Sequence, residues 1–303
     1  MATTVTTRPT AERSVANTLA SYLRLTKPRI IGLLVVTTVP AMVMAEGGMP
    51  SLWLILATVI GGSLAAGGAN AMNMYFDRDI DEMMLRTQGR PVPSGQIEPL
   101  WAAVFGLVLA AAGVGLIQIF VNPLAAVLTL FAFAFYVFVY TLILKRSTPW
   151  NIVIGGAAGA MPPLIGWAAV TGAISVESAL MFAIVTLWTP PHFWALSINY
   201  ANDYARAGVP MLPVVAGPEE TRRQILWHTL GMVAATIALG VVGGTGLIYM
   251  GSAVLLGAGF IYYAVALWRR PTPRESMALF RFSIIYLAAL FAAIMVDTLV
   301  VAA

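Results

Sequence analysis

The sequence predicts an all-α integral membrane protein with nine transmembrane helices. Hydrophobic residues make up 59% of its 303 residues and charged residues only 10%, whereas soluble domains carry about 25% charged residues. Nine apolar runs are separated by Gly, Pro or charge, and a bilayer span needs roughly 20 apolar residues. Because so few charges cannot cover a water-facing surface, we expect lipid to be the main solvent.

The elements follow from these runs in chain order. Residues 1–24 are polar, and they predict a disordered start that continues into an interfacial helix over residues 15–25. We treat residues 25–303 as a single transmembrane domain, because no soluble segment interrupts the runs. The expected spans are 30–45, 52–77, 100–120, 123–144, 152–170, 178–198, 225–242, 247–268 and 279–300.

Basic residues predict the orientation. All 17 Lys and Arg precede the first span or follow an even-numbered span. They are Arg8, Arg13, Arg24, Lys27, Arg29, Arg78, Arg86, Arg90, Lys145, Arg146, Arg206, Arg222, Arg223, Arg269, Arg270, Arg274 and Arg281. The positive-inside rule puts the N-terminus and these loops in the cytoplasm of a bacterial cell, with the protein in the inner (plasma) membrane. The net charge of +4 therefore needs no nucleic-acid partner.

Polar residues recur every fourth position at the end of the second span. Asn73, Asp77 and Asp81 share one helical face, and Asp79 points elsewhere. Like charges four residues apart repel, and carboxylates near a membrane are costly. A divalent cation removes both penalties, and Mg²⁺ typically takes one or two carboxylates plus substrate phosphate oxygens. The alternative is a helix end whose acids lie in water.

A second patch, Asn199 and Asp203, repeats the spacing after the sixth span, with Ala207 where a third acid would stand. We expect both patches to hold a diphosphate through Mg²⁺, with Asn73, Asp77, Asp81 and Asp203, and also Asn199, as ligands. The expected diphosphate-binding residues are Arg86, Arg90, Lys145 and Arg146. For Asp203 a loop cap is the alternative, and for the basic residues it is membrane topology. The chain has no cysteine, which excludes thiolate chemistry.

His192 lies in the run Thr189-Pro-Pro-His192-Phe-Trp194. Two prolines leave backbone carbonyls without partners, which membrane helices tolerate where protein lines a site. We expect the break to open a slot that His192 and Trp194 face. The alternative is a histidine hydrogen-bonded to a neighbouring helix, and for the second histidine, His228, a structural role is favoured.

Several of these runs resemble a known family. The stripe Asn73-x3-Asp77-x3-Asp81, followed by Arg86-Thr-Gln-Gly-Arg90-Pro, resembles the first signature of the UbiA superfamily of intramembrane prenyltransferases. The runs Thr189-Pro-Pro-His-Phe-Trp194 and Gly208-Val-Pro-Met-Leu-Pro213 resemble the branch that farnesylates heme. The resemblance covers nearly all of the chain after residue 20.

The resemblance implies nine helices around a central cavity and a Mg²⁺-dependent active site on the cytoplasmic side. It implies farnesyl diphosphate as donor and a vinyl group of heme B as acceptor, giving the heme O used by terminal oxidases or as the heme A precursor. Heme A synthase and oxidase assembly proteins are the partners it suggests. The second signature departs from the acid-rich form of quinone-type members, because it holds only Asp203 with Asn199 and Asn202 nearby.

Two rival functions remain. One is prenyl transfer to a different aromatic acceptor, which an assay of heme against hydroxybenzoate or chlorophyllide distinguishes. The other is an ion-coupled transporter. Transporters usually place their sites near the bilayer midplane, whereas these acids lie at helix ends, which favours the enzyme.

Overall fold

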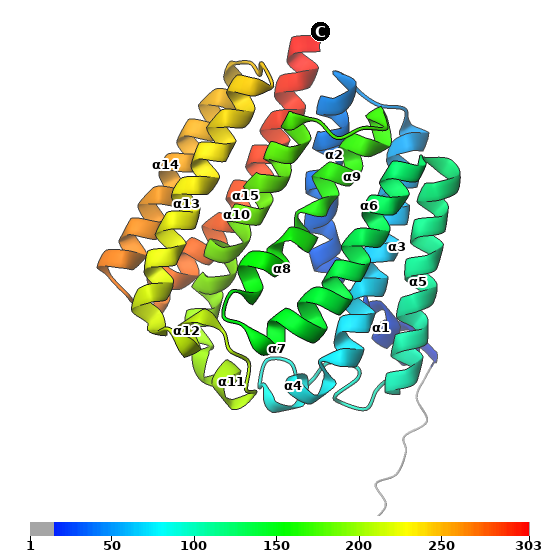
Figure 1. Cartoon of the computed structure of the whole chain (residues 1–303), viewed down its shortest axis with the longest axis vertical. Helices are drawn as coiled ribbons and strands as arrows, with labels where there is room; N and C mark the ends of the chain where they lie inside the picture. Colours follow the sequence, from blue (N-terminus) through cyan, green and yellow to red (C-terminus); the bar gives the residue numbers. More distant parts are fainter. Residues whose placement is uncertain (1–14, 303) are drawn as a thin grey trace, which may run out of the picture.

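The computed structural model describes residues 15–302, and all of its regular elements are helical (Figure 1). Within those residues, nine helical segments are long and apolar enough to cross a membrane, and they correspond one for one to the predicted spans. The chain is therefore a multi-pass membrane protein. A helix occupies the predicted residues 15–25 as α1 (Val15–Leu25), and its interfacial position stays a prediction. The predicted disordered start includes residues 1–14, which lie outside the described residues.

The spanning segments are single helices except the fourth and fifth, which are composite. The single ones are α2 (Pro28–Glu46), α3 (Leu52–Phe76), α5 (Pro99–Phe120), α10 (Val176–Asn199), α13 (Gly217–Val242), α14 (Leu247–Arg269) and α15 (Pro273–Ala302). The fourth span joins α6 (Pro123–Ala134), the π-helix η1 (Phe135–Leu144) and α7 (Lys145–Ser147), and the fifth joins α8 (Asn151–Gly159) and α9 (Met161–Thr171).

The short helices gather at one end of the bundle. This end, at the bottom of Figure 1, carries α4 (Arg78–Met83), α7, α11 (Ala201–Arg206) and α12 (Leu212–Val215). The described C-terminus lies at the opposite end. The loops that follow even-numbered spans, which contain the basic residues, therefore share one face of the molecule.

Two spans begin earlier than expected. Helix α13 starts at Gly217 and α15 at Pro273, whereas hydropathy predicted residues 225 and 279. Their first turns carry Glu219 and Glu220 in α13 and Glu275 in α15. Acidic residues suit a helix N-terminus because their negative charge complements the helix dipole. Proline suits it because the backbone N–H group that proline lacks would have no partner in the first turn. The apolar run therefore begins only after the charged first turns, although these turns already belong to the helix.

The fourth span widens into a π-helix just before Lys145. Its hydrogen bonds reach five residues back, and the Thr141 hydroxyl donates to the Tyr136 carbonyl at 2.9 Å in the same register. The ring of Tyr140 packs on α8, where a Cβ at Gly155 would lie 2.2 Å from the ring. Segments of π-helix are frequent at functional sites, and this one sets the direction of the residues that follow it.

An apolar cavity of about 170 Å³ lies between α2, α3, α6, η1, α8 and α9. It is lined along α3 from Asn70 to Thr58, a length of about 18 Å at 1.5 Å per residue. Tyr136 and Asn70 line it as well, and Asn70 stands one turn before Asn73. The cavity therefore begins directly beneath the acidic stripe.

Candidate active site

The acidic stripe crosses a junction between two helices. Helix α3 ends at Phe76 and α4 begins at Arg78, so the single helix expected through residue 81 is in fact two. The backbone N–H of Asp77 still donates to the Asn73 carbonyl at 2.9 Å, and that of Asp81 to the Asp77 carbonyl at 2.8 Å. The four-residue register therefore survives. All three polar residues of the stripe are buried: the solvent-exposed fraction is 4% for Asn73, 0% for Asp77 and 1% for Asp81.

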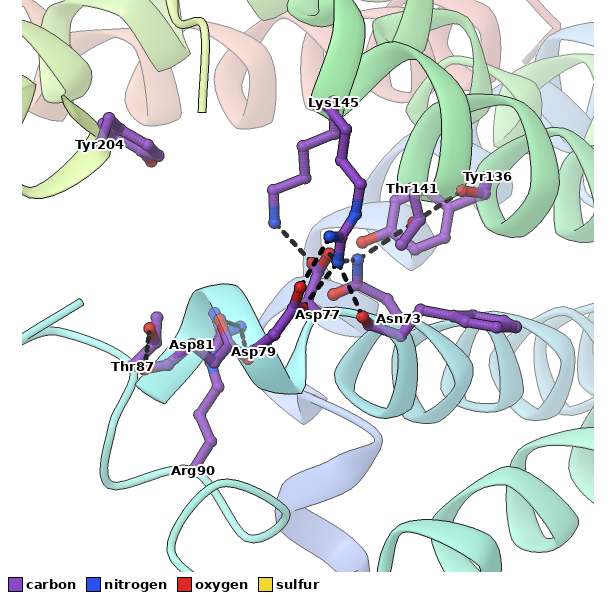
Figure 2. Close-up of polar contacts among 12 residues, drawn as sticks. Asn73, Asp77, Asp79, Asp81, Thr87, Arg90, Tyr136, Thr141, Lys145 and Tyr204 are labelled. Atoms are coloured by element: carbon purple, nitrogen blue, oxygen red, sulfur yellow. Dashed lines mark hydrogen bonds and ion pairs between the residues drawn. The ribbon is translucent and has the colours of Figure 1, made fainter. Parts of the chain in front are cut away.

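Asp77 is the centre of this site (Figure 2). Its Oδ2 accepts from the Asn73 amide at 2.8 Å and from the Lys145 ammonium at 2.5 Å. The same amide also donates to the Thr141 hydroxyl at 3.1 Å. The other oxygen, Oδ1, is buried without a hydrogen-bond partner, and Arg146 lies 4.0 Å from it. A buried polar atom is rarely left unpaired, which makes Oδ1 a candidate ligand atom.

Asp81 and Asp79 differ although they are two residues apart. One guanidinium nitrogen of Arg90, Nη1, donates to both oxygens of Asp81, at 2.8 and 2.7 Å. Asp79 keeps 59% of its side-chain exposure and pairs with Arg146 at 2.7 Å. Hydrogen bonding to Arg146 lowers the pKa of Asp79 to about 2. The spacing predicted this outward direction of Asp79, and Arg146 is consequently shared between the outer acid and the inner site.

Lys27 belongs to the site, although its position in the sequence indicated only membrane topology. Its ammonium group donates to Asn73 Oδ1 at 2.9 Å. Burial of that group, together with the nearby Arg90, lowers the pKa of Lys27 to about 7. Its backbone is left-handed, with φ 53°, directly before Pro28. Such strain in a residue with a side chain costs about 1–3 kcal/mol and occurs preferentially at functional sites. No sequence pattern predicts this backbone conformation, so the sequence does not identify Lys27 as a site residue.

The second polar patch is held more loosely. Asp203 forms an ion pair with Arg206 three residues later in the same helix, and the Asn199 amide donates to the Ser276 hydroxyl at 3.2 Å. Arg86 donates to the Tyr204 hydroxyl at 3.3 Å. A pocket of about 380 Å³ is lined by Leu85, Arg86, Asn199, Tyr200, Asn202 and Asp203. Arg86 therefore connects the loop after the first patch to the second patch.

The donor set fits magnesium bound together with a phosphate ligand. Among the described residues, no three His, Cys, Asp or Glu side chains stand close enough to hold a metal ion by themselves. Mg²⁺ is usually bound through one or two carboxylates plus substrate phosphates. Asp77 offers a buried, unpartnered Oδ1 for this purpose. Asp81 and Asp203 are ion-paired with arginines, which an arriving diphosphate can take over.

His192 and Trp194 do not face one slot. The His192 ring stacks against Trp188 and Phe280, and its Nδ1 lies 2.6 Å from the Ser283 hydroxyl of α15. Trp194 is fully buried and meets His228 of α13 edge to face, at 5.3 Å between ring centroids. Two residues apart on a helix means a rotation of about 200°. The expected shared slot is therefore absent, and only His192 retains partial exposure.

Comparison with known proteins agrees with this geometry. The UbiA prenyltransferase family model matches residues 34–292. The chain belongs to the UbiA prenyltransferase family. It is 53% identical over 285 residues to protoheme IX farnesyltransferase 1 of Saccharopolyspora erythraea, covering 93% of this chain and 91% of the relative. It is 51% identical over 284 residues to protoheme IX farnesyltransferase of Frankia alni, covering 92% and 98%.

Some relatives are longer. Protoheme IX farnesyltransferase of Chloroflexus aurantiacus is 50% identical over 282 residues, covering 93% of this chain but 48% of that protein. The chain thus spans about half the length of this relative and of the one from Roseiflexus sp., of which 53% is covered.

Solved structures show the same fold at low identity. A digeranylgeranylglyceryl phosphate synthase aligns with TM-score 0.77 and 19% identity, over 93% of this chain and 99% of that one. A UbiA homolog from Archaeoglobus fulgidus bound to GPP and Mg²⁺ aligns with TM-score 0.64 and 17% identity, over 90% and 99%.

Proposed function

We propose that this chain transfers a farnesyl group from farnesyl diphosphate to a vinyl group of heme B, giving heme O. The observation that carries the prenyl-transfer step is Asp77, a fully buried carboxylate with one oxygen unpartnered and Lys145 on the other. The choice of heme as acceptor is supported by relatives about 50% identical that bear the name protoheme IX farnesyltransferase.

In this proposal the two polar patches bind the diphosphate from opposite sides. Asn73, Asp77 and Asp81 would hold Mg²⁺ in the first patch, and Asp203 with Asn199 would hold it in the second. When bound, Mg²⁺ neutralises the charge that grows on the leaving diphosphate. Four cationic side chains act on the same charge, which is where electrostatic catalysis is strongest. They are Arg86, Arg90, Lys145 and Arg146, and Lys27 is the addition suggested by its contact with Asn73.

The farnesyl chain extends into the apolar cavity along α3. Its eleven chain bonds span about 13 Å when extended, at roughly 1.2 Å per bond. The lined length from Asn70 to Thr58 is about 18 Å, which accommodates that chain. Its apolar walls exclude water while the C–O bond breaks and the vinyl carbon attacks farnesyl C1. Diphosphate leaves with the electron pair of the C–O bond, and the vinyl π electrons form the new C–C bond. A water molecule admitted after this step adds to the carbon left cationic and loses its proton to the released diphosphate, which gives the hydroxyethylfarnesyl group.

The direct test is a defined reaction. Purified full-length chain, farnesyl diphosphate, heme B and Mg²⁺ are incubated, and the porphyrins are analysed by mass spectrometry. We expect a product heavier than heme B by one farnesyl group plus one hydroxyl group. Hydroxybenzoate and chlorophyllide are offered in parallel, and geranylgeranyl diphosphate competes as donor. Prenylation of another acceptor in preference to heme would refute the proposed acceptor but leave prenyl transfer intact.

The proposal also places the site at the cytoplasmic face of a bacterial plasma membrane, near heme A synthase or oxidase assembly partners. The absence of cysteine makes a clean test available. Met49→Cys lies in the loop after α2, at a residue 61% exposed, and Gln88→Cys lies in the loop after α4 at an exposed position. An impermeant thiol reagent applied to intact cells should label only Met49→Cys. The reverse pattern would invert the orientation.

A further inference from the structure

His192 is held in a rigid stack of aromatic rings between α10 and α15. Its ring lies between Trp188, at 4.3 Å and 15° between planes, and Phe280, at 4.7 Å and 24°. The indole N–H of Trp188 donates to the Ser283 carbonyl at 2.8 Å, and His192 contacts the hydroxyl of the same serine at 2.6 Å. Two residues one turn apart on α10 thus bind one residue of α15, which fixes the orientation of the imidazole.

The hydrogen bonds also determine which ring nitrogen carries the proton. The Ser283 hydroxyl donates its single proton to the Phe280 carbonyl at 2.7 Å. With its proton placed on that carbonyl, the hydroxyl oxygen accepts from His192, and on this basis we assign the ring proton to Nδ1. A neutral imidazole has one N–H group, which leaves the lone pair of Nε2 available. No hydrogen bond of the described residues involves Nε2, and the side chain is only half-buried.

This arrangement is that of a metal-binding histidine. Such a residue almost always donates its other ring N–H to a fixed acceptor, which sets the tautomer and the ring direction. Neutral imidazole is the ligand form, and heme iron is commonly held by histidine. We infer that His192 binds the acceptor by coordinating the heme iron through Nε2. The inference rests on the proposed function, because it requires that the acceptor contains iron.

The depth of His192 suits an acceptor. It precedes Asn199 by seven residues on α10, which places it about 10 Å deeper than the second polar patch. The inference requires that a diphosphate bound between the two patches places farnesyl C1 at a comparable depth. An iron ligand there holds the porphyrin plane below the diphosphate, so a vinyl group at the porphyrin edge can meet C1.

His228 provides a matched control, since the chain has only two histidines. Its Nδ1 lies 2.8 Å from the Gln224 carbonyl of its own helix, four residues earlier. That bond joins no second helix, and the ring meets Trp194 edge to face. The Nδ1 bond of His228 meets the same requirement for a fixed acceptor, so two features distinguish His192: its bond to a second helix and its place on α10 beneath the second polar patch. We expect the iron bond at His192 for that reason.

The test compares iron protoporphyrin IX with iron-free protoporphyrin IX, titrated by absorbance into the purified full-length chain in detergent. We expect the unmodified chain to bind the iron form at least about tenfold more tightly, the usual scale for support of a metal ligand. His192→Ala should lose that preference, change the Soret band of bound heme, and keep its affinity for iron-free porphyrin. Ser283→Ala should weaken the preference, and His228→Ala should retain it.

Several outcomes would overturn the inference. One is an equal affinity of the unmodified chain for both porphyrins, which requires no variant and so does not depend on folding. Another is an unchanged Soret band and affinity in His192→Ala, and a third is loss of iron-free binding as well, which would indicate packing. If the unmodified chain binds neither porphyrin, the proposed acceptor itself fails. Binding of both with equal affinity leaves that acceptor standing and removes only the iron bond.

Discussion

The two polar patches share the spacing Asn-x3-Asp at the same end of the bundle, but their surroundings differ. Asp77 is paired with Lys145, a residue 68 positions away, and the neighbouring Asn73 contacts Lys27, 46 positions away. Asp203 is paired with Arg206 in its own short helix. The first patch is therefore preassembled from three parts of the chain, whereas in the second patch the carboxylate of Asp203 is paired within its own helix and lines a pocket. We infer that the first patch fixes the metal and that the second closes on the diphosphate.

The largest effect is expected from metal removal, which should disable both patches at once. Turnover should vanish with excess chelator and return with Mg²⁺, because the carboxylates and the diphosphate are both anions that need a cation between them. Heme O formation by the purified chain is the measurement. Full activity in excess chelator would exclude metal bridging at either patch.

Asp77→Ala should be the most damaging single substitution. It removes the candidate ligand atom Oδ1 and leaves Lys145 without its partner, so we expect turnover to fall by about 10²–10³-fold, the scale of losing one preorganised electrostatic group. Asp77→Asn is the control that keeps the shape and removes the charge. Activity within threefold of the unmodified chain in both variants would refute the central position of Asp77.

Asp203→Ala should have an intermediate effect. Because the partner of Asp203 is local, we expect a loss of about 10–100-fold, seen mainly as a higher KM for farnesyl diphosphate. Thermal unfolding should change less than in Asp77→Ala. If Asp203→Ala lowers kcat as far as Asp77→Ala does, the two patches have equivalent roles and the comparison above is wrong.

Lys27 should make diphosphate binding depend on pH. Its pKa is lowered to about 7 by burial and nearby cations, and a bound diphosphate raises it again. Because the bound state then holds more protons, affinity is highest below pH 7 and falls above it, by at most about tenfold per pH unit. Lys27→Met should bind more weakly at pH 6.5 and lack this component. Pyrophosphate used as the ligand titrates in the same way with the unmodified chain and with Lys27→Met. Identical pH profiles of binding to these two chains would therefore contradict the role given to Lys27.

Asp79→Ala should have the smallest effect. Asp79 is 59% exposed and its bond with Arg146 lies at the surface, where an ion pair contributes about 0–1 kcal/mol. We expect activity to fall by less than about threefold. The lowered pKa of Asp79 stabilises the fold above about pH 4, and that contribution is lost as pH falls toward 2. A loss as large as that of Asp77→Ala would show that the stripe is assigned to the wrong helical face.

The sequence predicts the local part of this architecture well. Hydropathy identifies the nine spans because each must present apolar residues along a bilayer length. It misplaces the starts of α13 and α15, where Glu219 and Glu275 belong to the helix but not to the apolar run. The four-residue spacing identifies Asn73, Asp77 and Asp81 because helical neighbours are close in sequence.

Contacts between distant segments are beyond such patterns. Lys27 contacts Asn73 because its own backbone is left-handed, a conformation that the residue types around it do not predict. Thr141 reaches the same amide because η1 widens the fourth span. The different directions of His192 and Trp194 follow from their spacing on one helix, but the residues that each contacts depend on which helices flank α10. Each of these requires the packing of whole helices, which one sequence without its fold does not specify.

The π-helix η1 has a consequence for how this chain tolerates length changes. A wide turn of this kind holds one residue more than an α-helix needs for the same rise. Deleting a single residue between Phe135 and Leu144 would let the span relax into α-helix, as far as its hydrogen bonds are concerned. Because the wide turn takes up the extra residue, that deletion would leave Lys145 close to its direction toward Asp77, whereas a deletion in the α-helical part of the span would turn it by about 100°. An in-frame loss of one codon should therefore be tolerated better within η1 than within α6.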